Sequence, residues 1–293
     1  MKKIKFIILF FIALFITIPN VNAANITSSA QTVYPGQSFN VSVSLFAASW
    51  NVHTSTSGPV SGCIMNDANA SDTAMNVNKV VSATCTATGV GTMSFYEPTT
   101  KTFGILGHGI IDGDTNSLIN IDSGELVTAK ILSLKKAECG VPGEIKGTII
   151  NSQTIGDIRK NTPFGVFGIL NNITALNIDT SKTMEIALRN EIEVGKASVL
   201  CAFNDNNIAK EYDVKIEKIY KDNDFNNKSM LVKITDENLL NETGGIIRGL
   251  SGAPIIQNGK FIGAITNVLV SDPSVGYAIF ADLMIKELNK SID

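Results

Sequence analysis

Short stretches in which apolar and polar residues alternate occur along much of the chain, and this period of two is typical of half-buried β-strands. The clearest early example is 39–45, and further strands are predicted at 78–84 and 92–96. Later strand-like runs lie at 126–132, 145–150, 183–188, 197–202 and 230–234. Helical spacing is clear only at 281–290, where Leu283, Met284 and Leu288 would share one face. The pattern predicts a mainly β fold of barrels or a sandwich, with one terminal helix.

The first 23 residues follow a different pattern. Three lysines at positions 2, 3 and 5 precede an apolar stretch over 6–18, and small residues, Val21 and Ala23, follow it. This order is typical of a secretory signal peptide, and an uncleaved membrane anchor is the alternative. Either interpretation predicts that residues 24–293 work outside the cytoplasm, secreted or attached to a membrane through the N-terminal segment.

A change in composition near residue 96 predicts two domains. Residues 24–96 carry three charged side chains, whereas residues 97–293 carry 45. The first segment is rich in Ser, Thr, Asn, Val and Ala, and it is predicted to form a small immunoglobulin-like β-sandwich with Trp50 in its core.

Overall composition narrows the range of functions. With 24 basic and 27 acidic side chains the formal net charge is −3, so no basic surface for nucleic acid is expected. The chain has two histidines and no Cys-x-x-Cys pair, so neither a structural zinc site nor another cofactor is expected. The sequence leaves open which of the four cysteines form disulfides and which remain buried thiols, namely Cys63, Cys85, Cys139 and Cys201.

The strongest chemical signal is the hexapeptide GLSGAP at 249–254. Glycine on both sides of a serine permits a tight turn in which the hydroxyl projects and nearby main-chain N–H groups converge. Gly-x-Ser-Gly-x-Pro is the pattern around the nucleophile of chymotrypsin-like peptidases. Ser251 is therefore the predicted nucleophile, with the N–H groups of Gly249 and Ser251 as the oxyanion hole. A glycine-rich hairpin turn without a catalytic role is the alternative.

A serine nucleophile also needs a base and a group that orients it. His108 is the only histidine between residues 97 and 293, because His53 lies in the predicted N-terminal domain. Spacing alone does not select the carboxylate that would orient the imidazole. The candidates are Asp112, Asp114, Asp122 and Asp236.

Several further motifs accompany these residues. They are FGILGHGIIDGDT at 103–115, PGE at 142–144, TIGDI at 154–158, PFGVFG at 163–168, SMLVKITD at 229–236, GG at 244–245, GLSGAPIIQNG at 249–259, IGAIT at 262–266, DP at 272–273 and GY at 276–277. In these motifs residues 97–293 resemble the SpoIVB peptidase family, serine peptidases of bacterial spore formation. The resemblance implies two packed β-barrels of the chymotrypsin type. It also implies a catalytic triad of His108, Asp236 and Ser251.

The resemblance further implies an extracytoplasmic endopeptidase that needs no cofactor. Such an enzyme would act between the two membranes of a developing spore. It would cleave itself and a protein substrate, a membrane-bound regulator. Residues 24–96 do not resemble the PDZ domain typical of the family, so its role in presenting substrate is not carried over. A secreted adhesion or scaffold protein with an inactive peptidase fold is the alternative. A cell-wall hydrolase has little support, because no spacing singles out a pair of carboxylates.

Overall fold

A computed structural model describes the backbone and side chains of residues 91–111, 118–119, 121, 123–176, 183–203, 209–221 and 227–290, except the side chains of 149–153 and 175. It also describes the backbone of the strands at 24–28, 38–45, 50–51, 60–65, 71–72 and 77–87. The predicted signal peptide and four residues considered above lie outside this description, namely His53, Asp112, Asp114 and Asp122. The chain divides into two compact units, Met1–Gly89 with Ile111–Asp122 and Val90–Ile110 with Ser123–Asp293.

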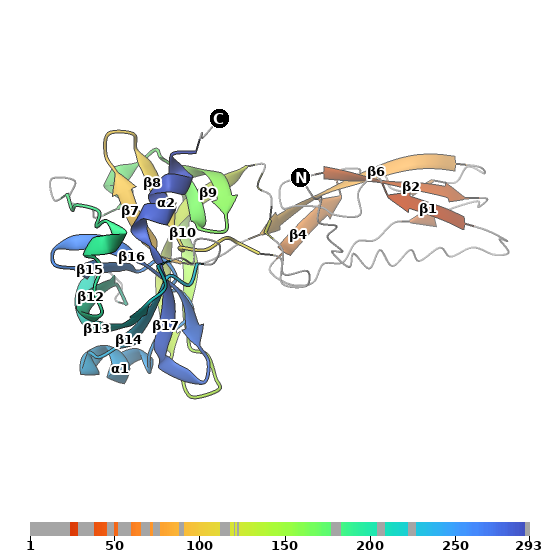
Figure 1. Cartoon of the computed structure of the whole chain (residues 1–293). Helices are drawn as coiled ribbons and strands as arrows, with labels where there is room; N and C mark the ends of the chain where they lie inside the picture. Colours follow the sequence, from red (N-terminus) through yellow and green to blue (C-terminus); the bar gives the residue numbers. More distant parts are fainter. Residues whose placement is uncertain are drawn as a thin grey trace. The chain divides into compact units, whose positions relative to one another are not determined.

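The first unit contains two antiparallel sheets. Four strands pair in the order β1-β2-β6-β4 (Figure 1), and β3 pairs with β5. The strands are β1 Ala24–Ser28, β2 Ser38–Leu45, β3 Trp50–Asn51, β4 Val60–Met65, β5 Ser71–Asp72 and β6 Val77–Ala87. The strands predicted at 39–45 and 78–84 thus fall within β2 and β6. The side chains of Trp50, Cys63 and Cys85 lie outside the described residues, so the immunoglobulin-like sandwich stays a prediction.

The second unit combines a five-stranded sheet, β7-β8-β11-β10-β9, with a closed barrel, β12-β13-β14-β17-β16-β15, and every strand pair is antiparallel (Figure 1). The sheet strands are β7 Met93–Glu97, β8 Thr102–Ile105, β9 Gly124–Lys135, β10 Glu144–Thr162 and β11 Gly165–Leu170. The barrel strands are β12 Gly195–Cys201, β13 Lys210–Ile219, β14 Met230–Ile234, β15 Pro254–Gln257, β16 Lys260–Leu269 and β17 Asp272–Phe280. The helices are α1 Glu237–Thr243 and α2 Ala281–Leu288, with single 3₁₀ turns at Ile173–Ala175 and Arg189–Glu191. The predicted mainly β fold is confirmed, and its second barrel is an open sheet.

Three local features differ from the sequence-based predictions. The strand predicted at 92–96 for the N-terminal domain is β7, and it pairs with β8 of the second unit. The segment 183–188 forms a single bridge, between Ile186 and Phe261, instead of a strand. Helix α1 was not predicted, because seven residues are too few to show a helical period. Its ends carry ordinary capping residues: Asp236 is the N-cap, and Gly244, with a φ of 74°, is the C-cap.

The barrel interior forms the largest core of the second unit. Its strands bury aliphatic side chains, among them Val199, Val214, Val232, Ile255, Ile265 and Ile279. Helix α2 packs against β16 and β17 through Leu283, Met284 and Leu288, as its pattern predicted. A smaller core under the five-stranded sheet contains Phe103, Ile155 and Leu170. Burial of each such side chain stabilises the folded state by about 1.5–3 kcal/mol. The barrel and the five-stranded sheet therefore form a stable support for the loops between their strands.

Replacing Met284 tests the packing of α2. Met284 is 0% exposed, so Met284→Ala removes buried side-chain atoms and leaves a cavity. We expect the free energy of unfolding to fall by about 2–5 kcal/mol in urea denaturation. Lys286 is exposed on the same helix, and Lys286→Ala should change this value by less than about 0.5 kcal/mol. Equal effects of the two substitutions would contradict the packing described.

Candidate active site

The loop that carries His108 begins with a tight turn directly after β8. The Gly107 N–H donates to the Ile105 carbonyl at 2.9 Å, and Leu106 between them has a φ of 71°. This three-residue arrangement is a γ-turn, which is strained when its central residue has positive φ. The Leu106 side chain is buried, and this burial helps to hold the strained backbone in place. The turn ends β8 at Ile105, and His108 follows it in the loop, where it is half-buried.

The His108 ring has a defined tautomer. Its Nδ1 lies 2.9 Å from the Gly109 carbonyl oxygen, and since a carbonyl only accepts, the proton is assigned to Nδ1. In the neutral ring Nε2 then carries the lone pair that a general base needs. Burial lowers the pKa of His108 below its ordinary value of 6.5, and the bond to Gly109 opposes this shift. His108 is therefore a neutral imidazole near pH 7.

Asn161, which the sequence analysis did not identify, fixes the chain beyond His108. From the end of β10 its Oδ1 accepts from the Ile110 N–H at 2.8 Å, and its Nδ2 donates to the Ile110 carbonyl at 2.8 Å. The two bonds hold Ile110 through both of its peptide groups, since its N–H and its C=O belong to successive peptides. No sequence signal marks this role, because Asn161 lies 51 residues from the loop it holds.

The turn that carries Ser251 requires glycine at two positions. Gly249 and Gly252 have φ values of 106° and 94°, which side chains rarely adopt. A Cβ on Gly252 would also lie 2.1 Å from the Thr92 carbonyl oxygen. Between them Leu250 is buried, whereas Ser251 is partly exposed. The turn is thus anchored in the core and presents the serine at the surface, as the hexapeptide predicted.

The orientation of the two predicted oxyanion donors, the N–H groups of Gly249 and Ser251, is set by the carbonyls of the same peptide groups. The Arg248 carbonyl accepts from Ile145 N at 2.9 Å, and the Leu250 carbonyl accepts from Ala253 N at 2.9 Å. In a planar trans peptide the N–H points opposite to the C=O. The N–H groups of Gly249 and Ser251 are therefore turned away from these partners, and no hydrogen bond within the described part of the chain uses either of them.

The loop with His108 and the turn with Ser251 meet on β16. The Ser251 hydroxyl donates to the Thr266 carbonyl at 3.0 Å. A Cβ on Gly107 would lie 3.1 Å from Thr266 Cγ2. Gly107, directly before His108, therefore packs against Thr266, the residue whose carbonyl accepts the hydrogen bond from Ser251. The structure brings the two segments together, and in this conformation the hydroxyl is directed to Thr266.

Asp236 occupies a different structural position, at the end of β14. Its Oδ1 accepts from Leu239 N at 3.0 Å, and its Oδ2 accepts from Asp213 N at 3.5 Å. The carboxylate therefore caps α1. No hydrogen bond among the described residues joins Asp236 to His108, so its catalytic role stays a prediction.

The two described cysteines are free thiols. Burial raises the pKa of Cys201 to about 12, so this thiol stays protonated and is not a nucleophile. Cys139 is exposed, and its thiol donates to the Ser271 carbonyl. Within the described ranges no group of three or more His, Cys, Asp or Glu residues could hold a metal ion.

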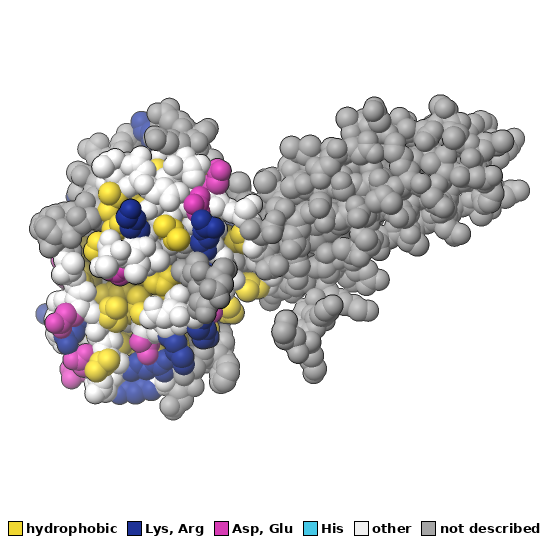
Figure 2. Space-filling model, turned by 90° about the horizontal axis from the view of Figure 1, so that it is seen from above, with side chains coloured by type: hydrophobic (Ala, Val, Ile, Leu, Met, Phe, Trp, Pro, Cys, Tyr) yellow, Lys and Arg dark blue, Asp and Glu magenta, His cyan; other side chains and the backbone are white. Residues whose placement is uncertain are grey.

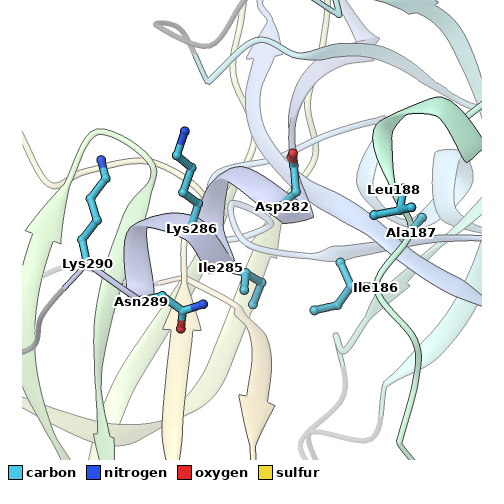
Figure 3. A pocket seen from close by; sticks show the side chains of 8 residues that line it. All are labelled: Ile186, Ala187, Leu188, Asp282, Ile285, Lys286, Asn289 and Lys290. Carbon is cyan, nitrogen blue, oxygen red and sulfur yellow. The ribbon is translucent and has the colours of Figure 1, made fainter.

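A shallow groove lies elsewhere on the second unit (Figure 3). Its lining residues are Ile186, Ala187, Leu188, Asp282, Ile285, Lys286, Asn289 and Lys290. Figure 2 shows apolar side chains exposed among lysines and arginines on one face of this unit. The groove contains neither His108 nor Ser251 and is separate from the candidate active site. Among the helices that the structure describes, none is long and apolar enough to cross a bilayer.

Two of three comparisons with known proteins found matches. The family model described as SpoIVB peptidase S55 matches residues 81–285. Eight chains of known structure match, including an inactive serine-to-alanine mutant of Rv3671c from M. tuberculosis. That match has 12% identity, covers 56% of this chain and 84% of the other, and has a TM-score of 0.34. No curated protein matches the sequence.

The closed barrel and the adjoining five-stranded sheet are consistent with the fold class of chymotrypsin-like serine peptidases. The family match extends across both of them. The chain belongs to the SpoIVB peptidase S55 family, a family of serine peptidases.

The environment of His108 predicts its titration. Because burial lowers its pKa, the ring C–H resonance of His108 should titrate with a midpoint below 6.5, and loss of this resonance in His108→Gln assigns it. Since the unfolded chain binds the proton more tightly, the contribution of His108 to stability is complete above pH 6.5 and is lost as the pH falls through the folded value. A midpoint at or above 6.5 would contradict the described burial.

Proposed function

We propose that this protein is an extracytoplasmic serine endopeptidase that acts through Ser251, His108 and Asp236. Ser251 Oγ attacks the carbonyl carbon of a peptide bond while His108 Nε2 takes its proton. The oxyanion of the tetrahedral intermediate accepts hydrogen bonds from the Gly249 and Ser251 N–H groups. His108 then delivers the proton to the leaving amine, and water releases the acyl group by the reverse sequence.

The observation that carries this proposal is the orientation of the peptides at 249–251. The N–H groups of Gly249 and Ser251 donate to no other group among the described residues, and the carbonyls of the same two peptides, those of Arg248 and Leu250, are hydrogen-bonded on the opposite side. These donors therefore need no rearrangement when negative charge develops on a substrate oxygen. Such preorganised donors are worth about 3–4 kcal/mol each to the transition state. A glycine-rich hairpin turn without a catalytic role would not need to keep both donors unpaired.

The hydroxyl must rotate before reaction. In the structure Ser251 donates to Thr266 O, and attack requires the proton to face His108 instead. The proposed mechanism therefore requires that the neutral hydrogen bond to Thr266 be replaced by one to His108. Catalytic hydrogen bonds are often formed only when substrate is bound, so the observed rotamer is compatible with the proposed mechanism.

Asp236 enters the proposal through the family resemblance, as the group that would stabilise charged His108. The same resemblance supports a role in spore formation, with a membrane-bound regulatory protein as substrate and with self-cleavage. Residues 24–96 differ from the domain expected in the family, so they would present a substrate in another way. The N-terminal segment would direct the protein across the membrane or hold it there.

Ser251→Ala tests the nucleophile. We expect wild-type protein to react with a fluorophosphonate probe and to hydrolyse a p-nitrophenyl ester, and Ser251→Ala to lose labelling and about 10⁶-fold in kcat. Ser274→Ala, which removes a serine bonded to Asp272 in β17, is the matched control and should label like wild type. Folded wild-type protein that does not label would favour the alternative of an inactive scaffold.

Asp236→Asn separates the two roles of Asp236. Asparagine also caps helices, so the Tm should stay close to that of wild type, whereas Asp236→Ala should lose about 1 kcal/mol of stability. If Asp236 assists His108, the kcat of Asp236→Asn should fall by about 10- to 1000-fold, because the charge that would stabilise the protonated ring is lost. Full activity in Asp236→Asn would leave Asp236 with its capping role alone.

A further inference from the structure

Thr92, directly before β7, bonds to both segments of the candidate active site. Its hydroxyl donates to the Gly249 carbonyl at 2.9 Å, and its N–H donates to the Ser251 carbonyl at 2.9 Å. Its own carbonyl accepts from Leu106 N at 3.2 Å, in the γ-turn before His108. Thr92 is half-buried and lies 157 residues from Gly249 in sequence. One residue thus joins the turn of the nucleophile to the loop of the base.

The hydroxyl bond holds the peptide that lies between the two oxyanion donors. The Gly249 carbonyl and the Leu250 N–H belong to one planar group, and Leu250 N donates to the Ile247 carbonyl at 3.1 Å. Gly249 has the wide conformational freedom of glycine, so the peptide can rotate unless both of its ends are held. Loss of the Thr92 hydroxyl leaves the carbonyl end without its partner.

Packing around Thr92 leaves little room for displacement. A Cβ on Gly252 would lie 2.1 Å from Thr92 O and 2.6 Å from Leu106 N, so these backbones are in close contact. A Cβ on Gly91 would lie 3.4 Å from Ser251 O. The strained γ-turn, the nucleophile turn and residues 91–92 therefore form one packed unit.

We propose that Thr92 is a positioning residue, whose hydroxyl fixes the oxyanion donors of Gly249 and Ser251 relative to His108. This inference rests on the proposed peptidase function. Thr92 does not touch the substrate; it acts through the orientation of the Gly249–Leu250 peptide. Its contribution should therefore be to kcat, where oxyanion stabilisation is expressed, and not to ground-state binding.

The test compares Thr92→Val, which keeps the shape and loses the hydroxyl, with Thr92→Ser, which keeps the hydroxyl. For hydrolysis of a p-nitrophenyl ester we expect Thr92→Val to lower kcat by about 10- to 100-fold with KM within about twofold, and Thr92→Ser to retain most of the activity. Thr102→Val is the matched control, since its hydroxyl bonds to Thr100 in the turn between β7 and β8, and it should leave kcat unchanged.

Hydrogen exchange of the Leu250 amide supplies a readout that does not need activity. Thr92→Val should speed this exchange by about fivefold, while Thr92→Ser and Thr102→Val should match wild type. Faster exchange with lower kcat supports the proposal. Unchanged exchange, unchanged kcat, or equal losses in Thr92→Val and Thr92→Ser would overturn it. The wild-type protein could fail to react with the fluorophosphonate probe and to hydrolyse the ester, while Thr92→Val still speeds exchange of the Leu250 amide. That result would contradict the proposed peptidase function but not the role of Thr92 in holding the turn.

Discussion

The candidate site depends on the planarity of three successive peptide groups. The carbonyls of Arg248, Gly249 and Leu250 are each held by a donor from elsewhere in the fold or turn. Because C=O and N–H are opposed in a trans peptide, fixing the carbonyls also fixes the amides. The fold thus sets the direction of the two predicted oxyanion donors, the N–H groups of Gly249 and Ser251, without any bond to these N–H groups. This leaves their hydrogen-bonding capacity for a substrate oxygen.

Two of the three donors that hold this turn come from distant parts of the chain. Ile145 lies in β10 of the five-stranded sheet and Thr92 directly before β7 of the same sheet, whereas Ser251 leads into the barrel strand β15. The turn is correctly shaped only when sheet and barrel have both formed. The proposed chemistry at Ser251 would thereby be coupled to the folding of the complete second unit, because a partly folded chain would not orient the predicted oxyanion donors.

The sequence predicted the parts of this arrangement that are local. The alternation over 230–234 matches β14, the spacing after residue 281 matches α2, and GLSGAP identified the strained turn by its glycines. Thr92 and Asn161 could not be found in this way. Their bonds span 157 and 51 residues, and a lone Thr or Asn in a strand-rich chain carries no periodic signal. The pairing of β7 with β8 was missed for the same reason, since alternation reveals a strand and not its neighbour.

The third member of the predicted triad raises a physical question about His108. The Gly109 carbonyl is sufficient to fix the tautomer, because it accepts the Nδ1 proton. A carbonyl dipole, however, stabilises an imidazolium much less than a carboxylate does. Burial keeps His108 neutral and ready to accept a proton, but the same burial increases the cost of charging the ring in the transition state. A nearby negative charge would offset that cost, so the value of a carboxylate here lies in stabilising the charged ring rather than in orienting it.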